Sequence, residues 1–266
     1  MADTLDVPED LPPLADRTLV VTRPASQAAE LAEALEALGA RALLFPTIEI
    51  RPPSDLGPLE AVARGASDYD WVIFTSANGV LAFHEASKRM GLEISRSVGA
   101  SRVCCIGPTT ARAAEGTGLP VSLIPERYVA EAVVDALDAT GQLQGQRILI
   151  PVAGGAREVL PRRLRQRGAI VDVVVAYETI PVGEVSVERL ARLHDGVDLV
   201  MFASPSSVRG FHRLVKGRQV APAAVIGPIT ASTARDLGYD VTVEAEDFTV
   251  TGLIEAVVCH YRDELQ

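Results

Sequence analysis

The sequence contains the same unit twice, and this repeat limits the folds open to the chain more than any other feature. Residues 19–40 return as 148–169, an offset of 129 that keeps the leucines and the final Gly-Ala in register. Residues 70–80 return as 198–208 with their Asp, Phe, Ser and Val positions kept. Internal repetition over such lengths indicates duplicated structural units. We therefore expect two similar domains with a cleft where they face each other.

Each repeat reads as strands that alternate with helices. Residues 17–22 are rich in Leu and Val, as in a strand covered on both faces, and 25–38 carry leucines at helical spacing until Gly39 ends the helix. The Ile-Gly-Pro strings at 106–108 and 226–228 form a further pair, offset by 120 residues. More strands are expected near 71–74, 102–106, 147–151, 198–202 and 223–226. Alternating strands and helices predict parallel sheets with helices on both faces.

Two ways of pairing the repeats remain open. The repeated segments are 17–50, 70–140, 146–181 and 198–260. Either the first packs with the second and the third with the fourth, or the middle two form one domain and the chain ends form the other. Repetition alone does not choose. The short join at 141–145 and the extended stretches at 48–53 and 177–181 favour the second arrangement.

Composition excludes several classes of function. The 266 residues carry a net charge of −10, which opposes general attraction to nucleic acid or anionic lipid. No apolar run approaches the roughly 20 residues that span a bilayer. Residues 1–16 lack the features of a secretory signal and are expected to form a loose leader. The three cysteines are expected to be buried, reduced core thiols, with Cys104 and Cys105 adjacent in a strand, so we expect a cytoplasmic protein.

Polar turns follow the predicted strands, at the sheet edge where open α/β folds bind ligands. Six helix starts gather there, each with unpaired backbone N–H groups that favour an anion by about 0.3 to 1 kcal/mol. Capping of the helices is the alternative role for these side chains, and it stays open for each of them. The candidate binding residues in these turns are Arg23, Thr75, Ser76, Asn78, Thr110, Ser204, Ser206, Ser207 and Thr230.

Familiar cofactor and nucleophile motifs are missing from the sequence. It contains neither a phosphate loop of the G-x-x-x-x-G-K-[ST] type nor a G-x-G-x-x-G fingerprint. His84 and His212 are repeat mates and are expected to be partly buried helix residues without metal-ligand spacing. We therefore expect no cofactor and no metal, and a chemistry that needs few side chains.

One arginine and one tyrosine stand apart from their surroundings. Five arginines crowd residues 157–167, and most of them are expected on a solvated face. Arg157 is predicted in the first turn of that helix, at the same edge as Arg23, where it could bind a carboxylate with two hydrogen bonds. Tyr177 lies in a predicted crossover, where it either packs the hinge or acts on a ligand.

Five strings in this order resemble the uroporphyrinogen-III synthase (HemD) family. They are Val-Thr-Arg-Pro at 21–24, Phe-Thr-Ser-Ala-Asn-Gly-Val at 74–80, Tyr-Glu-Thr at 177–179, Phe-Ala-Ser-Pro-Ser-Ser-Val at 202–208 and Ile-Gly-Pro-Ile-Thr-Ala at 226–231. The resemblance implies an α/β fold with two flavodoxin-like, three-layer domains of parallel sheets, joined by a two-stranded β linker. The expected domains are 1–50 plus 182–266 and 54–176, with linkers at about 47–53 and 177–183.

The resemblance also implies a reaction. Members of this family close linear hydroxymethylbilane, a tetrapyrrole with eight carboxylates, to uroporphyrinogen III with loss of water and inversion of ring D. Tyr177 matches the family tyrosine that assists departure of the terminal hydroxyl. Cleft positions of the family match Ser76, Thr110, Ser204, Ser206 and Thr230, and Arg23 matches its Thr-Arg-Pro turn. Ile229 departs from the Gly-Pro-Thr-Thr form seen at 107–110.

The remaining expectations concern partners and rival functions. We expect a monomer that makes transient contact with hydroxymethylbilane synthase, the preceding enzyme. A two-domain small-ligand binding protein of the periplasmic or repressor-effector type is the non-enzymatic alternative. The lack of an export signal and of a DNA-binding module counts against it. A flavodoxin-type flavin protein is the second alternative.

Overall fold

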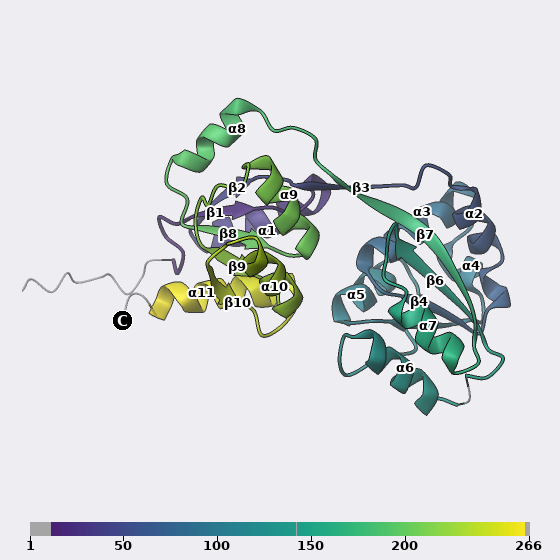
Figure 1. Cartoon of the computed structure of the whole chain (residues 1–266). Coiled ribbons are helices and arrows are strands. Elements are labelled where there is room, and N and C mark those ends of the chain that lie inside the picture. Colours follow the sequence, from purple (N-terminus) through teal and green to yellow (C-terminus); the bar gives the residue numbers. More distant parts are fainter. Residues whose placement is uncertain (1–11, 142, 264–266) are drawn as a thin grey trace, which may run out of the picture. The chain divides into compact units, whose positions relative to one another are not determined.

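The Leu- and Val-rich segments form the strands of two separate five-stranded sheets (Figure 1). The structure is a computed structural model that describes residues 12–141 and 143–263. The described residues up to Glu49, together with those from Ile180 onward, form one compact unit, here called the terminal unit. Residues Ile50–Thr179 form the other, the central unit. Each unit is described by itself.

In the terminal unit the strands follow the order β10-β9-β8-β1-β2, and all of their pairings are parallel. The strands are β1 Thr18–Val21, β2 Arg41–Leu44, β8 Leu199–Phe202, β9 Ala223–Val225 and β10 Val241–Glu244. The helical segments are α1 Ala25–Ala37, α8 Val187–Ala191, η2 Arg192–His194, α9 Pro205–Leu214, α10 Pro228–Asp236 and α11 Val250–Asp263.

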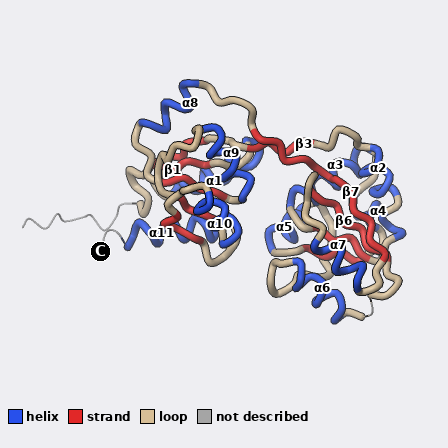
Figure 2. The backbone as a smooth tube through the Cα atoms, viewed as in Figure 1, coloured by secondary structure: helices blue, strands red, loops and turns tan. Residues whose placement is uncertain are grey.

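Helices cover both faces of this sheet, as Figure 2 shows by its red strands and blue helices. On one face, Val21 and Met201 pack with Leu31 of α1 and with α11. On the other face, Phe202 packs edge-on against Phe211 of α9, with ring centroids 5.6 Å apart. Burial on both faces explains why these strands are apolar along their whole length rather than alternating.

The central unit contains the order β3-β7-β6-β4-β5, with parallel pairing of β4 to β5, β4 to β6 and β6 to β7. The strands are β3 Ile48–Arg51, β4 Trp71–Phe74, β5 Arg102–Cys105, β6 Arg147–Ala153 and β7 Ile170–Pro181. The helical segments are α2 Gly57–Arg64, η1 Ala66–Asp68, α3 Ala77–Arg89, α4 Ile94–Val98, α5 Pro108–Gly116, α6 Ala130–Ala139 and α7 Val159–Gln166.

The two sheets are built alike, although the chain enters them at different points. β6, β7, β4 and β5 repeat the spatial order of β1, β2, β8 and β9. In the central unit α2, α3, α4 and α5 pack on one face, and α6 and α7 on the other. The chain passes between the units twice, within β3 and within β7, and these two strands are neighbours in sheet order. The predicted α/β class with parallel sheets is confirmed.

Two sequence-based expectations about burial are wrong. Residues 1–11 lie outside the described part of the chain, but Leu14 of the expected loose leader is fully buried in the core beside α1. Its backbone N–H donates to the carbonyl of Leu38 at 2.9 Å, which ties this segment to the end of α1. Cys104 and Cys105 are buried as expected, whereas Cys259 is exposed on α11.

Gly210 of α9 makes a close backbone contact that fixes the strand ends of the terminal unit. A Cβ atom at Gly210 would lie 2.7 Å from the carbonyl oxygen of Thr47. The Thr47 hydroxyl in turn lies 3.2 Å from the carbonyl oxygens of Thr22 and Ser207, and its single proton is shared between them. The glycine thus lets α9 approach the ends of β1 and the start of β3.

Gly210→Ala is expected to lower the free energy of unfolding by about 1 to 3 kcal/mol, because the new methyl group overlaps backbone that cannot move aside. The midpoint of urea denaturation, followed by circular dichroism, measures the effect. Gly116→Ala, at a helical glycine with no atom within 4 Å of the new methyl group, is the matched control. It is expected to leave stability unchanged or to raise it by up to about 1 kcal/mol. Equal stability of the two variants would contradict the close approach.

Candidate functional site

Each sheet has a central point where two neighbouring strands send their helices to opposite faces. In the terminal unit, β1 leads into α1 on one face and β8 leads into α9 on the other. In the central unit, β6 leads into α7 and β4 into α3, again on opposite faces. A crevice opens between such helices at the carboxyl ends of the strands, and open α/β sheets bind their ligands there.

Ser204 and Ser206 lie at this point in the terminal unit. Ser204 caps α9, because its hydroxyl accepts the backbone N–H of Ser207 at 3.1 Å. Its oxygen lies 2.9 Å from the Ser206 hydroxyl, and both side chains are half-buried. The Ser207 hydroxyl faces inward and donates to the carbonyl of Ser204 at 2.7 Å. Ser204 and Ser206 can therefore meet a ligand, whereas Ser207 serves the helix start.

Tyr177 and Ser76 are brought together at the corresponding point of the central unit. Their hydroxyl oxygens lie 3.0 Å apart. Ser76 caps α3 by accepting the backbone N–H of Gly79 at 3.0 Å. Thr75 and Asn78 are half-buried residues on either side of this cap. A tyrosine hydroxyl and a helix N-terminus thus share one position at the carboxyl edge of the sheet.

Tyr177 is held by the strand in which it lies. It belongs to β7, where it is paired with Ala153, and its carbonyl accepts the backbone N–H of Gly154 at 2.7 Å. Only 8% of the residue is exposed, and its ring packs in the core with Phe74 and Val80. A ring fixed in this way presents its hydroxyl in one direction, which an acid or hydrogen-bond donor requires.

Thr110 and Thr230 occupy equivalent places in the first turns of α5 and α10. Neither caps its helix, since the N-cap residues are Gly107 and Gly227. Both residues are buried, at 5% and 3% exposure. Within the described residues, neither hydroxyl has a hydrogen-bond partner, which leaves both available to a ligand at the helix start.

The two arginines differ in how firmly they are held. Arg23 is half-buried after β1, and its guanidinium donates to the Gln27 side chain at 3.0 Å. Burial lowers the pKa of Arg23, and Glu30 acts in the opposite direction. Arginine nonetheless stays protonated in proteins. Arg157 is exposed and precedes α7, which begins at Val159, so its expected place in the first helical turn is wrong.

The buried cysteines and the helix histidines do not form a nucleophilic or metal-binding site. Burial, first of all, raises the pKa of the Cys104 and Cys105 thiols to about 12, so neither forms a thiolate near neutral pH. His84 and His212 are partly buried on α3 and α9, as expected. In the part of the chain that the structure describes, no three His, Cys, Asp or Glu side chains are grouped to hold a metal ion.

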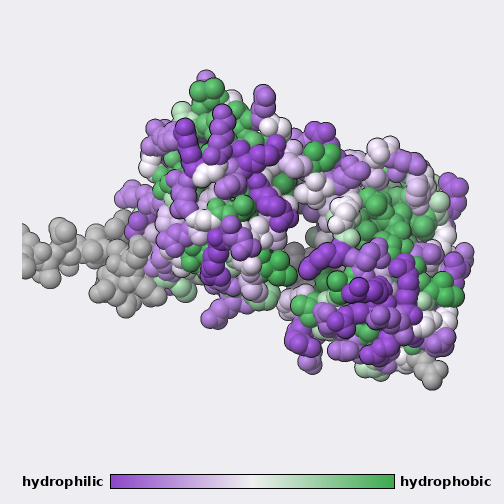
Figure 3. Space-filling view, in the orientation of Figure 1, coloured by the Kyte–Doolittle hydropathy of each residue, from purple (hydrophilic) through white to green (hydrophobic). Residues whose placement is uncertain are grey.

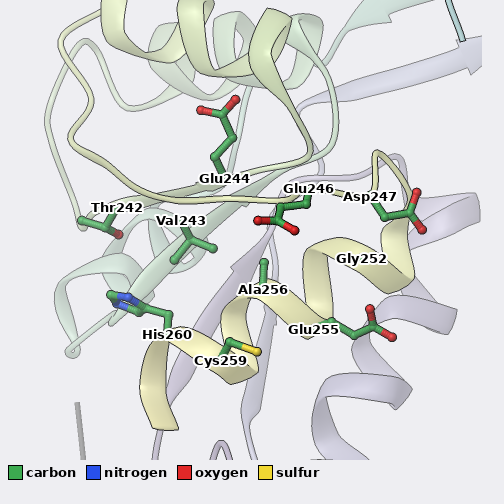
Figure 4. A pocket seen from close by; sticks show the side chains of 10 residues that line it. All are labelled: Thr242, Val243, Glu244, Glu246, Asp247, Gly252, Glu255, Ala256, Cys259 and His260. Atoms are coloured by element: carbon green, nitrogen blue, oxygen red, sulfur yellow. The ribbon is translucent and has the colours of Figure 1, made fainter. Parts of the chain in front are cut away.

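A pocket of about 570 Å³ lies between β10 and α11 of the terminal unit (Figure 4). Carboxylates dominate its wall, and Cys259 and His260 add the only sulfur and imidazole. Its acidic lining residues are Glu244, Glu246, Asp247 and Glu255. This concentration of negative charge repels an anionic ligand, so the pocket and the strand-end positions suit different molecules.

Two aromatic residues at these edges carry no motif that singles them out in the sequence. Tyr128 and Phe248 contact the cap glycines Gly107 and Gly227. The 120-residue offset of the Ile-Gly-Pro strings pairs them, and that offset is the one sequence signal that could have found them.

The fold defines a class: duplicated, doubly wound α/β proteins with polar helix starts at the strand ends. A family model described as "Uroporphyrinogen-III synthase HemD" matches residues 29–255. This chain belongs to the uroporphyrinogen-III synthase family, whose members are enzymes. The comparisons do not favour a two-domain small-ligand binding protein.

Two relatives and one solved structure illustrate the similarity. The uroporphyrinogen-III synthase of Synechococcus elongatus is 32% identical and covers 92% of this chain and 96% of its own length. A putative uroporphyrinogen-III synthase of Methanothermobacter thermautotrophicus is 35% identical, with coverages of 90% and 96%. A mutant uroporphyrinogen III synthase of Thermus thermophilus has a TM-score of 0.62 at 20% identity, over 93% of this chain and 99% of that one, which shows the shared fold.

The visible surface and the helices give two further facts. Hydrophilic side chains dominate the face seen in Figure 3, with hydrophobic surface over part of β7. Among the described helices, none is long and apolar enough to cross a membrane.

Alkylation tests the inertness of the paired thiols. Iodoacetamide at pH 8 is expected to label Cys259 alone in the folded protein, because it is exposed while a thiol of pKa about 12 is ionised only to about one part in ten thousand. Peptide mass spectrometry identifies the labelled positions, and the same reaction in urea, where all three should react, is the control. Labelling of Cys104 or Cys105 in the folded state at a rate close to that of Cys259 would contradict the burial and pKa described here.

Proposed function

We propose that this chain closes hydroxymethylbilane to uroporphyrinogen III, with loss of water and inversion of ring D. The observation that carries the proposal is the 3.0 Å contact between the hydroxyls of Tyr177 and Ser76 at the start of α3. Family membership supports the reaction, and the geometry supports the roles given to individual residues below.

Tyr177 acts on the leaving hydroxyl. The terminal hydroxymethyl group of the substrate loses its oxygen as the electron-rich pyrrole ring pushes electrons toward the carbon. A proton must reach that oxygen for water to leave, and the neutral phenol of Tyr177 donates it or a hydrogen bond. Ser76 can donate its own proton to the Tyr177 oxygen while its lone pair accepts the Gly79 N–H. Tyr177 and Ser76 thus form a short donor chain that ends at the leaving group.

Helix starts and hydroxyls bind the substrate carboxylates. α3 and α5 begin at the carboxyl edge of the central sheet, and α9 and α10 begin at that of the terminal sheet. Unpaired N–H groups at each start favour an anion. Thr110 and Thr230 add unpartnered hydroxyls, and Arg23 adds a positive charge next to α1. Local groups of this kind can hold an octa-acid although the chain as a whole carries a charge of −10.

Ring inversion then becomes a matter of positioning. Spontaneous closure joins the unturned ring D and gives the type I isomer. Holding the other rings while the substituted carbon of ring D meets the new electrophilic methylene favours a spiro intermediate, whose opening and reclosure turn the ring over. Positioning of this kind can contribute several kcal/mol. The type III product therefore requires tight placement more than strong acid–base chemistry.

The setting of the reaction is a further part of the proposal. A cytoplasmic location agrees with two buried, free thiols at Cys104 and Cys105. We further propose a monomer, with transient contact to hydroxymethylbilane synthase, since that enzyme makes the substrate. Arg157 and Asn78 remain proposed contacts to the substrate carboxylates from the central unit.

Tyr177→Phe is expected to lower kcat for hydroxymethylbilane by about a hundredfold, since it removes the proposed proton donor. Chromatography of the oxidised products measures both the rate and the ratio of type III to type I isomer. Tyr69→Phe is the matched control, because Tyr69 in the same unit also donates a hydrogen bond, to Asp172 at 2.7 Å. It is expected to cost about 1 kcal/mol of stability without changing kcat. Full turnover by Tyr177→Phe would remove Tyr177 from the mechanism.

Thr230→Ala is expected to raise KM about fivefold, the equivalent of one lost hydrogen bond of about 1 kcal/mol to a substrate carboxylate. Thr230→Ser should restore most of the affinity by keeping the hydroxyl. Thr233→Ala on the same helix removes a hydroxyl that bonds to the Ile229 carbonyl at 3.1 Å and should leave KM unchanged. Wild-type steady-state kinetics for Thr230→Ala would exclude that residue from the binding site.

A further inference from the structure

Two exposed aromatic side chains lie at matching places in the two units. Tyr128 and Phe248 are 120 residues apart, the same offset that separates Gly107 from Gly227. Each stands in the loop two residues before a helix, since α6 begins at Ala130 and α11 at Val250. The Phe248 loop follows β10, and the Tyr128 loop follows Leu123, which makes a parallel bridge to Cys104 of β5, so both aromatics lie at the carboxyl edge of their sheet. The repeat thus places an aromatic ring at the ligand edge of each unit.

Each ring lies directly on the glycine that caps the neighbouring helix. A Cβ atom at Gly107 would lie 3.2 Å from two atoms of Tyr128, Cγ and Cδ1. A Cβ atom at Gly227 would lie 2.7 Å from Cδ1 of Phe248. Glycine at both caps therefore lets the ring approach the backbone.

These rings are nevertheless open to solvent over much of their surface. Tyr128 is 42% exposed and Phe248 is 51% exposed. Ile229, in the first turn of α10, is 59% exposed at the same helix start. Covering such apolar surface is favourable by about 25 cal/mol per Å². The start of α10 thus offers apolar surface beside the hydroxyl of Thr230.

We propose that Tyr128 and Phe248 bind pyrrole rings of the substrate, each in its own unit, while the neighbouring helix starts hold the attached carboxylates. The inference rests on the proposed function and deepens it. The proposed function names binding groups for the substrate carboxylates, and this inference names binding groups for the pyrrole rings. Pyrrole and phenyl rings pack well offset or edge-to-face, and such a contact adds to the gain from burial alone. Neutral rings also add binding without repelling the eight carboxylates.

Leucine substitutions test the rings, because leucine keeps apolar volume but cannot stack. Tyr128→Leu and Phe248→Leu are each expected to raise KM for hydroxymethylbilane about fivefold, because each variant loses one contact between rings. We expect kcat to change less than twofold. Phe248→Tyr keeps the ring and should restore the wild-type KM. Val187→Ala, at an apolar side chain 83% exposed on α8, is the control for loss of exposed apolar surface and should leave KM unchanged.

A double-mutant cycle separates a role in binding from a role in folding. Gly227→Ala should displace the Phe248 ring and raise KM as Phe248→Leu does, and the double variant should show no further rise, because both changes remove the same contact. Values of KM within twofold of wild type for both leucine variants would overturn the inference. Additive effects of the two changes, or a rise in KM that Phe248→Tyr does not reverse, would overturn it as well.

Wild-type activity in the same assay keeps this inference apart from the function on which it rests. If the wild-type protein leaves hydroxymethylbilane to close spontaneously to the type I isomer, the proposed function fails. If the wild type makes type III product and the leucine variants match it in KM, only the role of Tyr128 and Phe248 fails.

Discussion

Parallel strand pairing beneath helices on both faces is the constraint on which the rest of each unit depends. Val20 and Val21 are adjacent in β1, point to opposite faces and are both fully buried, one in the cluster with α9 and one in the cluster with α1. Parallel strands require a crossover between them, so every carboxyl end and every helix start comes to the same edge. The polar turns therefore gather at one edge as a consequence of how the core is built.

The fold could be read from the sequence because its signals are local and repeated. Runs such as the one before Val21 and the helix stop at Gly39, where φ is +89°, belong to the segment itself. The burial of Leu14 was not predicted, because its side chain packs in a core formed by distant strands and helices, and no pattern in its own neighbourhood signals this. The position of Arg157 was predicted wrongly by about one helical turn, because α7 begins only at Val159 and no capping residue in the sequence marks that start.

The candidate site divides in the same way between local and distant causes. Ser76 and Ser204 cap their helices, as their residue type and position predict. Capping joins residues only three apart, so the local sequence is enough to predict it. The contact of Ser76 with Tyr177 spans 101 residues and depends on the pairing of β7 with β6, where the register shifts between Val152 and Ala153. Sequence pattern and family resemblance identified both residues, but the contact between their hydroxyls is seen only in the folded structure.

Charge explains why neutral groups dominate the proposed site. Interactions between exposed charges are screened within about 10 Å, so the net charge of −10 acts on an approaching octa-acid as a weak general repulsion. The groups at the strand ends act within one helical turn: backbone N–H groups, the hydroxyls of Thr110 and Thr230, and the rings of Tyr128 and Phe248. Each of these is directional or flat, so it holds an anion or a ring in one orientation, whereas a lysine patch would hold the same anion in many. A reaction that selects one isomer by positioning gains more from such groups than from stronger attraction.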